Sequence, residues 1–220
     1  MIENSSDSGR ADLPNVLAIF PLASAVLLPR QVLPLNIFEP RYLSMVEDAL
    51  RSGRHIGMIQ PVSTDSASDP VPVYPIGCAG RITSFQETQD GRFLIQLTGV
   101  CRFQVAEELA SEKGYRRVRP DWQPYRADLE EGSDAAVSVK SLEGSLRTYL
   151  EMNGLKVDWD MLHKLPPAHL VDFLAVNLPL DVEEKQALVE TPSAAERAEV
   201  LQSTLEIAVK ATSAPNQKLH

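Results

Sequence analysis

The chain has 220 residues, of which 44% are hydrophobic and 23% charged, and its formal net charge is −9. This composition is that of a globular protein, long enough for one large domain or two smaller ones with a core that needs no disulfides. Residues 1–125 carry 12 Lys and Arg against 14 Asp and Glu, net −2, and residues 126–220 carry 9 against 16, net −7. A net-negative chain without a long basic run lacks the charge pattern of a phosphate-backbone binder, so nucleic acid is not an expected partner.

Both ends of the chain have the composition of disordered tails, which we predict at residues 1–15 and 213–220. The first fifteen residues, MIENSSDSGRADLPN, are polar and acidic, so they do not resemble a signal peptide. No stretch approaches the ~18 to 20 apolar residues that a membrane span needs. We therefore expect a cytoplasmic protein with no membrane partner.

Residues 16–125 are predicted to form a β-rich domain. Its opening part, 19–42, contains short apolar runs separated by Pro21, Pro29 and Pro34. Because proline donates no backbone hydrogen bond and makes the preceding residue extended, this part is expected to form short strands with bends, at 16–20 and 31–38.

A short amphipathic helix follows, with Pro40 in its first turn and its end near Arg51. Apolar residues recur in it at helical spacing, so one face is predicted to pack inward. These residues are Tyr42, Met45, Val46, Ala49 and Leu50.

The rest of the β-rich domain is predicted to contain a strand at 55–60, a proline-rich loop at 61–75 and a β-hairpin with arms 76–85 and 92–105. Asp90-Gly91 supplies the hairpin turn, and Gly99 marks a bulge or bend in the second arm.

A further strand is predicted at 115–122, where Pro120 indicates an edge or an end. The only basic cluster, Arg116, Arg117 and Arg119, lies in this strand. It suggests either an RNA-binding edge or an edge strand that its charges protect from pairing, and alternation along the strand places Arg116 and Arg117 on opposite faces.

Residues 126–212 are predicted to form an all-α helical bundle. Helices are expected from 133 to about 153, from Pro167, at 182–190 and from 194 to about 211. Asp181 with Glu184, and Ser193 with Glu196, have the spacing of capping boxes at the last two helix starts.

The sequence contains no pattern that announces catalysis or metal binding. Cys78 and Cys101 lie in apolar segments without metal-ligand spacing, so we interpret them as buried thiols. The histidines are scattered, and His163 and His169 are six residues apart rather than an i,i+4 pair. We therefore expect no catalytic residues, no metal and no cofactor.

The β-rich half resembles the N-terminal substrate-binding domain of Lon proteases. The segments that carry this resemblance are, in chain order, FPL, LLP, LPLNIFEPRY, IGMI, GCAGRI and DGRFLIQLTGVCRF. The helical half is similar to that domain's helical part in LPLDVEEKQALVE and AERAEVL, and the resemblance covers about 16–211. It implies an α+β fold, in which a bent, partly closed PUA-like β-barrel with one short helix is followed by the helical bundle.

Full Lon proteases continue into ATPase and protease modules, and the sequence contains no GxxxxGK[ST] phosphate-binding motif. The resemblance is therefore to a stand-alone Lon N-terminal domain, which is not an enzyme. Such a module could bind unfolded or degradation-bound polypeptides as an adaptor or regulator of a protease. The alternative is a PUA-like module that binds RNA or a small ligand in regulation.

Two sets of candidate residues follow. The box that leads into the first helix is expected to be structural, with Phe38 and Tyr42 as core anchors and Glu39 and Arg41 capping the chain reversal; its members are Pro34, Phe38, Glu39, Pro40, Arg41 and Tyr42. The polypeptide-binding candidates are apolar residues of the opening stretch and of the proline-rich loop: Leu22, Val26, Leu27, Val71, Val73 and Tyr74. The sequence leaves open whether these six face the solvent or the core.

Overall fold

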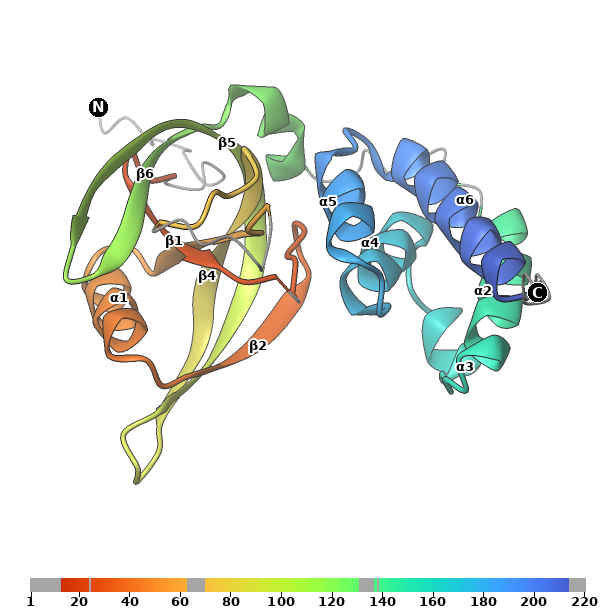
Figure 1. The fold of residues 1–220 in the computed structure, drawn as a ribbon, viewed down its shortest axis with the longest axis horizontal. Helices are drawn as coiled ribbons and strands as arrows, with labels where there is room; N and C mark the ends of the chain where they lie inside the picture. Colours follow the sequence, from red (N-terminus) through yellow and green to blue (C-terminus); the bar gives the residue numbers. More distant parts are fainter. Residues whose placement is uncertain (1–12, 24, 63–69, 131–136, 138, 214–220) are drawn as a thin grey trace, which may run out of the picture. The chain divides into compact units, whose positions relative to one another are not determined.

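The computed structural model describes residues 13–23, 25–62, 70–130, 137 and 139–213. The predicted tails therefore lie outside the described residues, except for 13–15 and 213. The chain divides into two compact units between residues 131 and 132, and each unit is described by itself. The first is β-rich and the second is helical (Figure 1).

The β-rich unit is built on a closed ring of strands. The ring contains β1 (Leu17–Pro21), β3 (His55–Ile59), β4 (Ile76–Glu87), β5 (Phe93–Glu112) and β6 (Tyr115–Asp121). β1 pairs in parallel with β3, and the other pairs are antiparallel. The ring closes because β5 pairs with β4 along its first half and with β6 along its second half. β6 is thus paired on both sides, so of the two predicted alternatives, an edge or an end, the edge is wrong, and Pro120 lies one residue before the end of the strand.

The sixth strand, β2 (Val32–Ile37), lies outside the ring and, among the described residues, pairs with β5 alone. The turn before β2 is fixed at Gly99, whose backbone nitrogen donates to the Gln31 oxygen and whose oxygen accepts from the Arg30 nitrogen, both at 2.8 Å. A Cβ atom at Gly99 would lie 2.0 Å from the Leu28 oxygen, so only glycine permits this approach. The register between β4 and β5 shifts next to Gly99, as predicted for a bulge.

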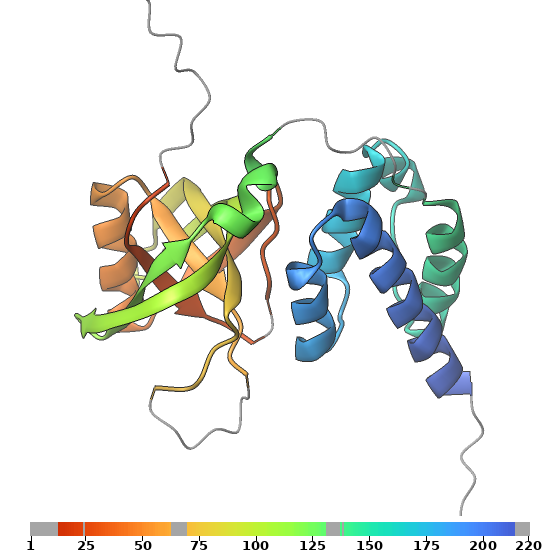
Figure 2. The ribbon, with the colours of Figure 1, turned by 90° about the horizontal axis from the view of Figure 1, so that it is seen from above.

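Helix α1 (Pro40–Arg51) lies against the side of the barrel (Figures 1 and 2) and has the predicted bounds. Its buried face contains Tyr42, Met45, Val46 and Ala49. These side chains belong to the main core cluster of the barrel, together with Ile56 of β3 and Leu97 of β5.

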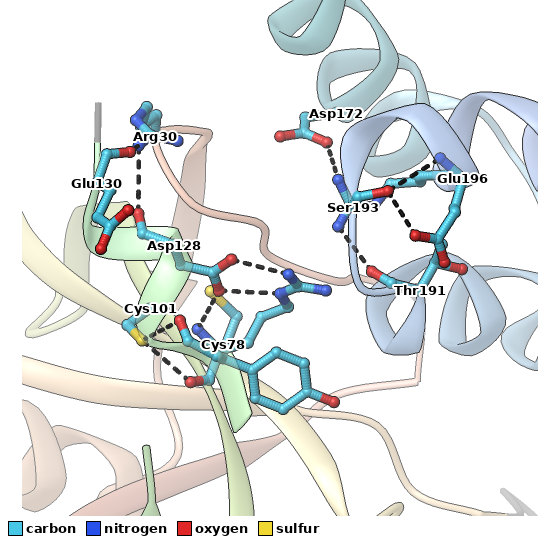
Figure 3. A network of polar contacts seen from close by, with 12 residues as sticks. Arg30, Cys78, Cys101, Asp128, Glu130, Asp172, Thr191, Ser193 and Glu196 are labelled. Atoms are coloured by element: carbon cyan, nitrogen blue, oxygen red, sulfur yellow. Dashed lines mark hydrogen bonds and ion pairs between the residues drawn. The ribbon is translucent and has the colours of Figure 1, made fainter. Parts of the chain in front are cut away.

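After β6 the chain forms a short 3₁₀ segment, η1 (Gln123–Leu129), which was not predicted. A buried ion pair fastens it to β5: Arg102 Nη2 lies 2.8 Å from Asp128 Oδ1, with side chains 3% and 9% exposed (Figure 3). Because these contacts join residues 102 and 128, the β-rich unit continues past the boundary predicted at 125 and 126.

Cys78 and Cys101 are both buried, as predicted. Burial raises the pKa of the Cys101 thiol to about 12 and the pKa of Cys78 well above its usual value. Both thiols are therefore protonated and poorly nucleophilic at neutral pH.

The helical unit contains α2 (Lys140–Met152), α3 (Trp159–Leu162), α4 (Pro167–Asn177), α5 (Val182–Glu190) and α6 (Ala194–Ser213). α6 packs against α2, α4 and α5 (Figure 1). α5 begins with the predicted capping box, and the Glu196 nitrogen donates to Ser193 Oγ at the start of α6. α3 was not predicted, and α2 begins at Lys140 rather than 133; residues 133–136 and 138 lie outside the described residues.

Within the described ranges, no helix has the length and apolar character required to cross a membrane.

Candidate functional site

A groove with a volume of about 660 Å³ lies in the β-rich unit, where β1, β5 and β6 meet the start of α1 and the loop after β3. We call it the mouth groove. Its lining combines apolar side chains with two arginines and a glutamate: Pro21, Arg41, Tyr42, Pro61, Pro70, Val71, Glu108, Leu109, Ser111, Gly114, Tyr115 and Arg116.

The start of α1 supplies Arg41 and Tyr42. The Tyr42 ring packs on Phe20 with a centroid distance of 4.3 Å, and its burial raises the pKa of the phenol. The Arg41 guanidinium lies 4.6 Å from the centroid of the Tyr42 ring and forms a 2.8 Å ion pair with Glu39. At this corner of the groove the Arg41 guanidinium therefore lies over the Tyr42 ring, and Glu39 offsets its positive charge.

A second paired charge lies between the strands and the loop. Arg116 Nε donates to Glu108 Oε1, and Arg116 Nη1 donates to the backbone oxygen of Val71, both at 2.7 Å. One guanidinium thus neutralises the carboxylate on β5 and holds the loop near β6. The groove has no uncompensated charge among these groups, so its polar contacts favour neither an acidic nor a basic ligand.

The tip of the β5–β6 hairpin is fixed to α1 through Asp48. Lys113 Nζ lies 2.7 Å from both carboxylate oxygens, and the Tyr115 hydroxyl donates to Oδ2 at 2.9 Å. The hydrogen bond from Lys113, and then that from Tyr115, lowers the pKa of the Asp48 carboxyl. Lys113 and Gly114 have φ values of 53° and 81°, the left-handed pair of a tight hairpin turn.

The predicted loop at 61–75 is partly ordered by backbone pairing. Val62 donates to the Pro72 oxygen at 2.8 Å, and Tyr74 donates to the Gln60 oxygen at 2.9 Å. Pro61 and Val73 form an isolated antiparallel bridge. Residues 63–69 lie outside the described residues. Of the predicted loop, the structure therefore describes only the two ends, 61–62 and 70–75.

The six candidates for polypeptide binding are not brought together. Val26 and Leu27 are 3% and 1% exposed, so the prediction that they contact a polypeptide is wrong. Leu22 is partly buried against the main barrel core, and Val73 packs against a second core cluster. Tyr74 is half-buried and is not among the groove residues. Val71 alone of the six lines the mouth groove.

The box before and within α1 has mixed roles. Tyr42 is buried, as predicted, whereas Phe38 is 61% exposed, so the expectation of a core anchor there is wrong. Phe38 follows Ile37, the inward residue at the end of β2, and therefore points to the other side of the strand. Glu39 makes no side-chain cap to α1 and instead pairs with Arg41. Pro34 lies in β2 opposite Gln96, and Pro40 is the first residue of α1.

Several groove residues were not predicted from the sequence. Glu108, Leu109 and Ser111 belong to the second half of β5, which was predicted to end near residue 105. Arg116 was considered only as part of a basic cluster. The alternation of AEELASE at 106–112 is too weak to predict a strand without the pairing that β6 provides.

A second cavity, of about 240 Å³, lies in the helical unit and has a mostly leucine lining. Its polar members are Glu143 and His163, whose Oε1 and Nε2 atoms are 3.5 Å apart. Among the described residues, no group of three or more His, Cys, Asp or Glu side chains is placed to hold a metal ion.

A strand ring with a neutral, partly apolar groove, joined in one chain to a helical bundle, is the architecture of an α+β binding module. The family model for the ATP-dependent protease La (LON) substrate-binding domain matches residues 16–206. The chain therefore belongs to the Lon substrate-binding domain family, and the resemblance inferred from its sequence is confirmed.

Relatives with known names agree with this assignment. The chain is 28% identical over 189 residues to Lon protease 2 of Myxococcus xanthus, a match covering 83% of this chain and 22% of that protein. It is 28% identical over 199 residues to the Lon protease of Dictyoglomus thermophilum, covering 84% of this chain and 24% of that one. The chain thus spans about a quarter or less of the length of these relatives.

Solved structures have the same fold. The Lon N-terminal domain protein from Xanthomonas campestris superposes with a TM-score of 0.61 at 25% identity, covering 86% of this chain and 97% of that one. The N-terminal domain of the Mycobacterium avium complex Lon protease superposes with a TM-score of 0.58 at 15% identity, covering 87% and 98%. The predicted α+β architecture is confirmed.

Proposed function

We propose that this chain binds unfolded or degradation-bound polypeptides in the mouth groove and has no catalytic activity of its own. The observation that supports the proposal most directly is the lining of the groove, where Val71, Leu109, Pro21 and Pro70 form apolar walls beside paired charges. Burial of apolar side chains is non-directional, so such walls accept many sequences. Membership of a substrate-binding domain family agrees with a groove of this kind.

The groove is proposed to distinguish unfolded from folded proteins by access. Its volume of about 660 Å³ accommodates several residues of an extended segment but not the surface of a folded domain. Arg116 and Arg41 are both paired with glutamates. Binding should therefore depend on exposed apolar residues in the client more than on its net charge.

The experiment is a binding titration with reduced, carboxymethylated α-lactalbumin, which stays unfolded, and native calcium-loaded α-lactalbumin as the folded comparison. We expect the chain to bind the first and not the second. Val71→Asp should weaken binding at least about tenfold, because it places a carboxylate on an apolar wall near Glu108.

Val62→Asp is the matched control. Val62 lies in the same loop and is 46% exposed, but it does not line the groove. The same chemical change there should leave the affinity within about twofold, a difference of roughly 0.4 kcal/mol. Equal affinities for the wild-type chain and Val71→Asp, or an equal loss in both variants, would contradict the proposed site.

We further propose that the chain acts in the cytoplasm as a regulator of a full-length Lon protease by competing for its substrates. The support is its similarity to the N-terminal part of Lon proteases. When the chain is added to a purified Lon protease that degrades the same unfolded α-lactalbumin, degradation should slow in proportion to the chain's concentration. Val71→Asp should not slow it. If the wild-type chain speeds degradation and Val71→Asp does not, the chain delivers substrates to the protease instead of competing for them. No effect of the wild-type chain would count against both roles.

The structure offers no specific support for the alternative of RNA or small-ligand binding. Arg119 is paired with Glu107 and Arg116 with Glu108, so the basic cluster is largely neutralised by β5. Arg117 donates to the backbone oxygen of Ala110. A phosphate backbone would have to displace these partners, which makes this surface a poor RNA-binding edge.

A further inference from the structure

One wall of the mouth groove is the edge of a strand. β4 pairs with β5 only as far as Gln104, and the Val105 nitrogen then donates to the Pro75 oxygen at 2.8 Å. From residue 106 to 112, β6 is the single strand paired with β5 in the described part of the chain. Glu108 and Leu109, consecutive residues whose side chains lie on opposite faces of the strand, both line the groove together with Ser111, so we take the opposite edge of this segment to face it.

Among the described residues, the segment just before β4 pairs with the end of β3. Val62 pairs with Pro72 and Tyr74 with Gln60, so residues 72–74 extend the β3 side instead of continuing β4 along β5. Among the described residues, the mouth groove therefore lies beside the part of β5 that only β6 pairs with, and Arg116 spans the groove by donating to the Val71 oxygen.

The edge of β5 is protected against pairing by glutamates and by an irregular register with β6 at 105–107 and 109–112, but not by a proline. The other edge strand, β2, carries Pro34 in its centre, and a proline there removes a backbone donor and discourages strand addition. The segment AEELASE at 106–112 contains no proline, and its residues 106, 107, 108, 110 and 111 are exposed.

We propose that residues 106–111 of β5 pair with the backbone of the bound polypeptide, which adds to the ring as an extra strand. This inference rests on the proposed function and adds to it the conformation of the client, an extended segment. An extended backbone presents donors and acceptors at the spacing of a strand edge, whereas a helical or folded segment uses them internally.

Charge at this edge is consistent with an uncharged, apolar client segment. Glu107 and Glu108 are the acidic residues at the start of the open edge, and both are paired with arginines of β6. Leu109 and Val71 also line the groove and are apolar. Backbone pairing would then supply affinity without regard to sequence, and the apolar walls would select segments that unfolding exposes.

The test uses a ten-residue peptide, chosen as the tightest binder among overlapping fragments of the unfolded α-lactalbumin. Two versions are made with N-methyl groups on alternate residues, one carrying them on the odd positions and one on the even positions. Alternate amides point to opposite edges of a strand, so one version loses its hydrogen bonds to β5 and the other keeps them. We expect one version to bind at least about tenfold more weakly than the other.

Hydrogen exchange gives a second readout on the unaltered protein. Amides of residues 106–111 should exchange more slowly when the unmodified peptide is bound, while those of residues 32–37 in β2 stay unchanged. Equal binding of the two N-methylated versions, or no protection at 106–111, would overturn strand addition even where Val71→Asp still weakens binding. Failure of the wild-type chain to bind the unfolded α-lactalbumin would instead overturn the proposed function.

Discussion

Replacing Asp172 by alanine should lower the free energy of unfolding of the helical unit by about 3–5 kcal/mol, because it leaves a buried arginine without its counter-charge. Asp172 of α4 pairs with Arg197 of α6 (Figure 3), and the two side chains are 10% and 3% exposed. Arg197 also donates to the backbone oxygens of Leu188 and Thr191, at 2.9 and 3.0 Å. One guanidinium thus connects α4, the end of α5 and α6.

The measurement is urea unfolding followed by the fluorescence of Trp159 in a Trp122→Phe background, since the chain has two tryptophans and Trp159 lies in the helical unit. Glu143→Ala is the matched control, because its partner Arg147 is 47% exposed and such pairs contribute about 0.2–1 kcal/mol. A loss for Asp172→Ala no greater than for Glu143→Ala would show that the buried pair is not required.

Replacing Gly99 by alanine should destabilise the β-rich unit by about 3 kcal/mol, at the upper end for an overpacked interior. The new Cβ would lie 2.0 Å from the Leu28 oxygen and 2.8 Å from its carbonyl carbon, and backbone atoms cannot rotate away as a side chain can. Moving the backbone would also break the hydrogen bonds that Gly99 makes with Arg30 and Gln31, worth about 1 kcal/mol each.

The fluorescence of Trp122, which packs against Phe103 in the barrel, reports this unfolding in a Trp159→Phe background. Gly144→Ala, followed by Trp159 in a Trp122→Phe background, is the control in the helical unit, because Gly144 is an exposed residue of α2 with no described neighbour within 4 Å of the added Cβ. That variant should gain about 0.5–1 kcal/mol from helix propensity. A Gly99→Ala protein as stable as the wild type would refute the steric argument, whereas failure to fold would agree with it.

Elements whose signals are local were predicted well. α1 has its predicted start at Pro40 and end at Arg51, and α5 begins at the Asp181 capping box. Such features depend on a proline's fixed φ or on a side chain three residues away, so the sequence alone contains the cause.

Elements that depend on distant partners were missed. The second half of β5 exists because β6 pairs with it, and η1 is fastened to β5 by Asp128 and Arg102, which are 26 residues apart. Neither segment has an apolar periodicity of its own. For the same reason, the boundary between the two units was predicted six residues too early.

The candidate site shows the same division. The sequence identified the family and pointed to the proline-rich loop, and Val71 of that loop does line the groove. It could not tell that Val26 and Leu27 are buried while Phe38 is exposed, because all three are apolar residues two or three positions before a proline.

The sequence by itself determined the family, the order of the strands and of the longer helices, and the positions where prolines and capping residues begin or end them. The tertiary structure alone decided that the 19–42 stretch packs inward at Leu27 and that residues 106–111, paired only with β6 in the described part of the chain, lie at a groove. The physical reason is that side-chain burial and strand pairing are properties of two chain segments at once. The local sequence specifies the conformation of one segment but not which other segment packs against it.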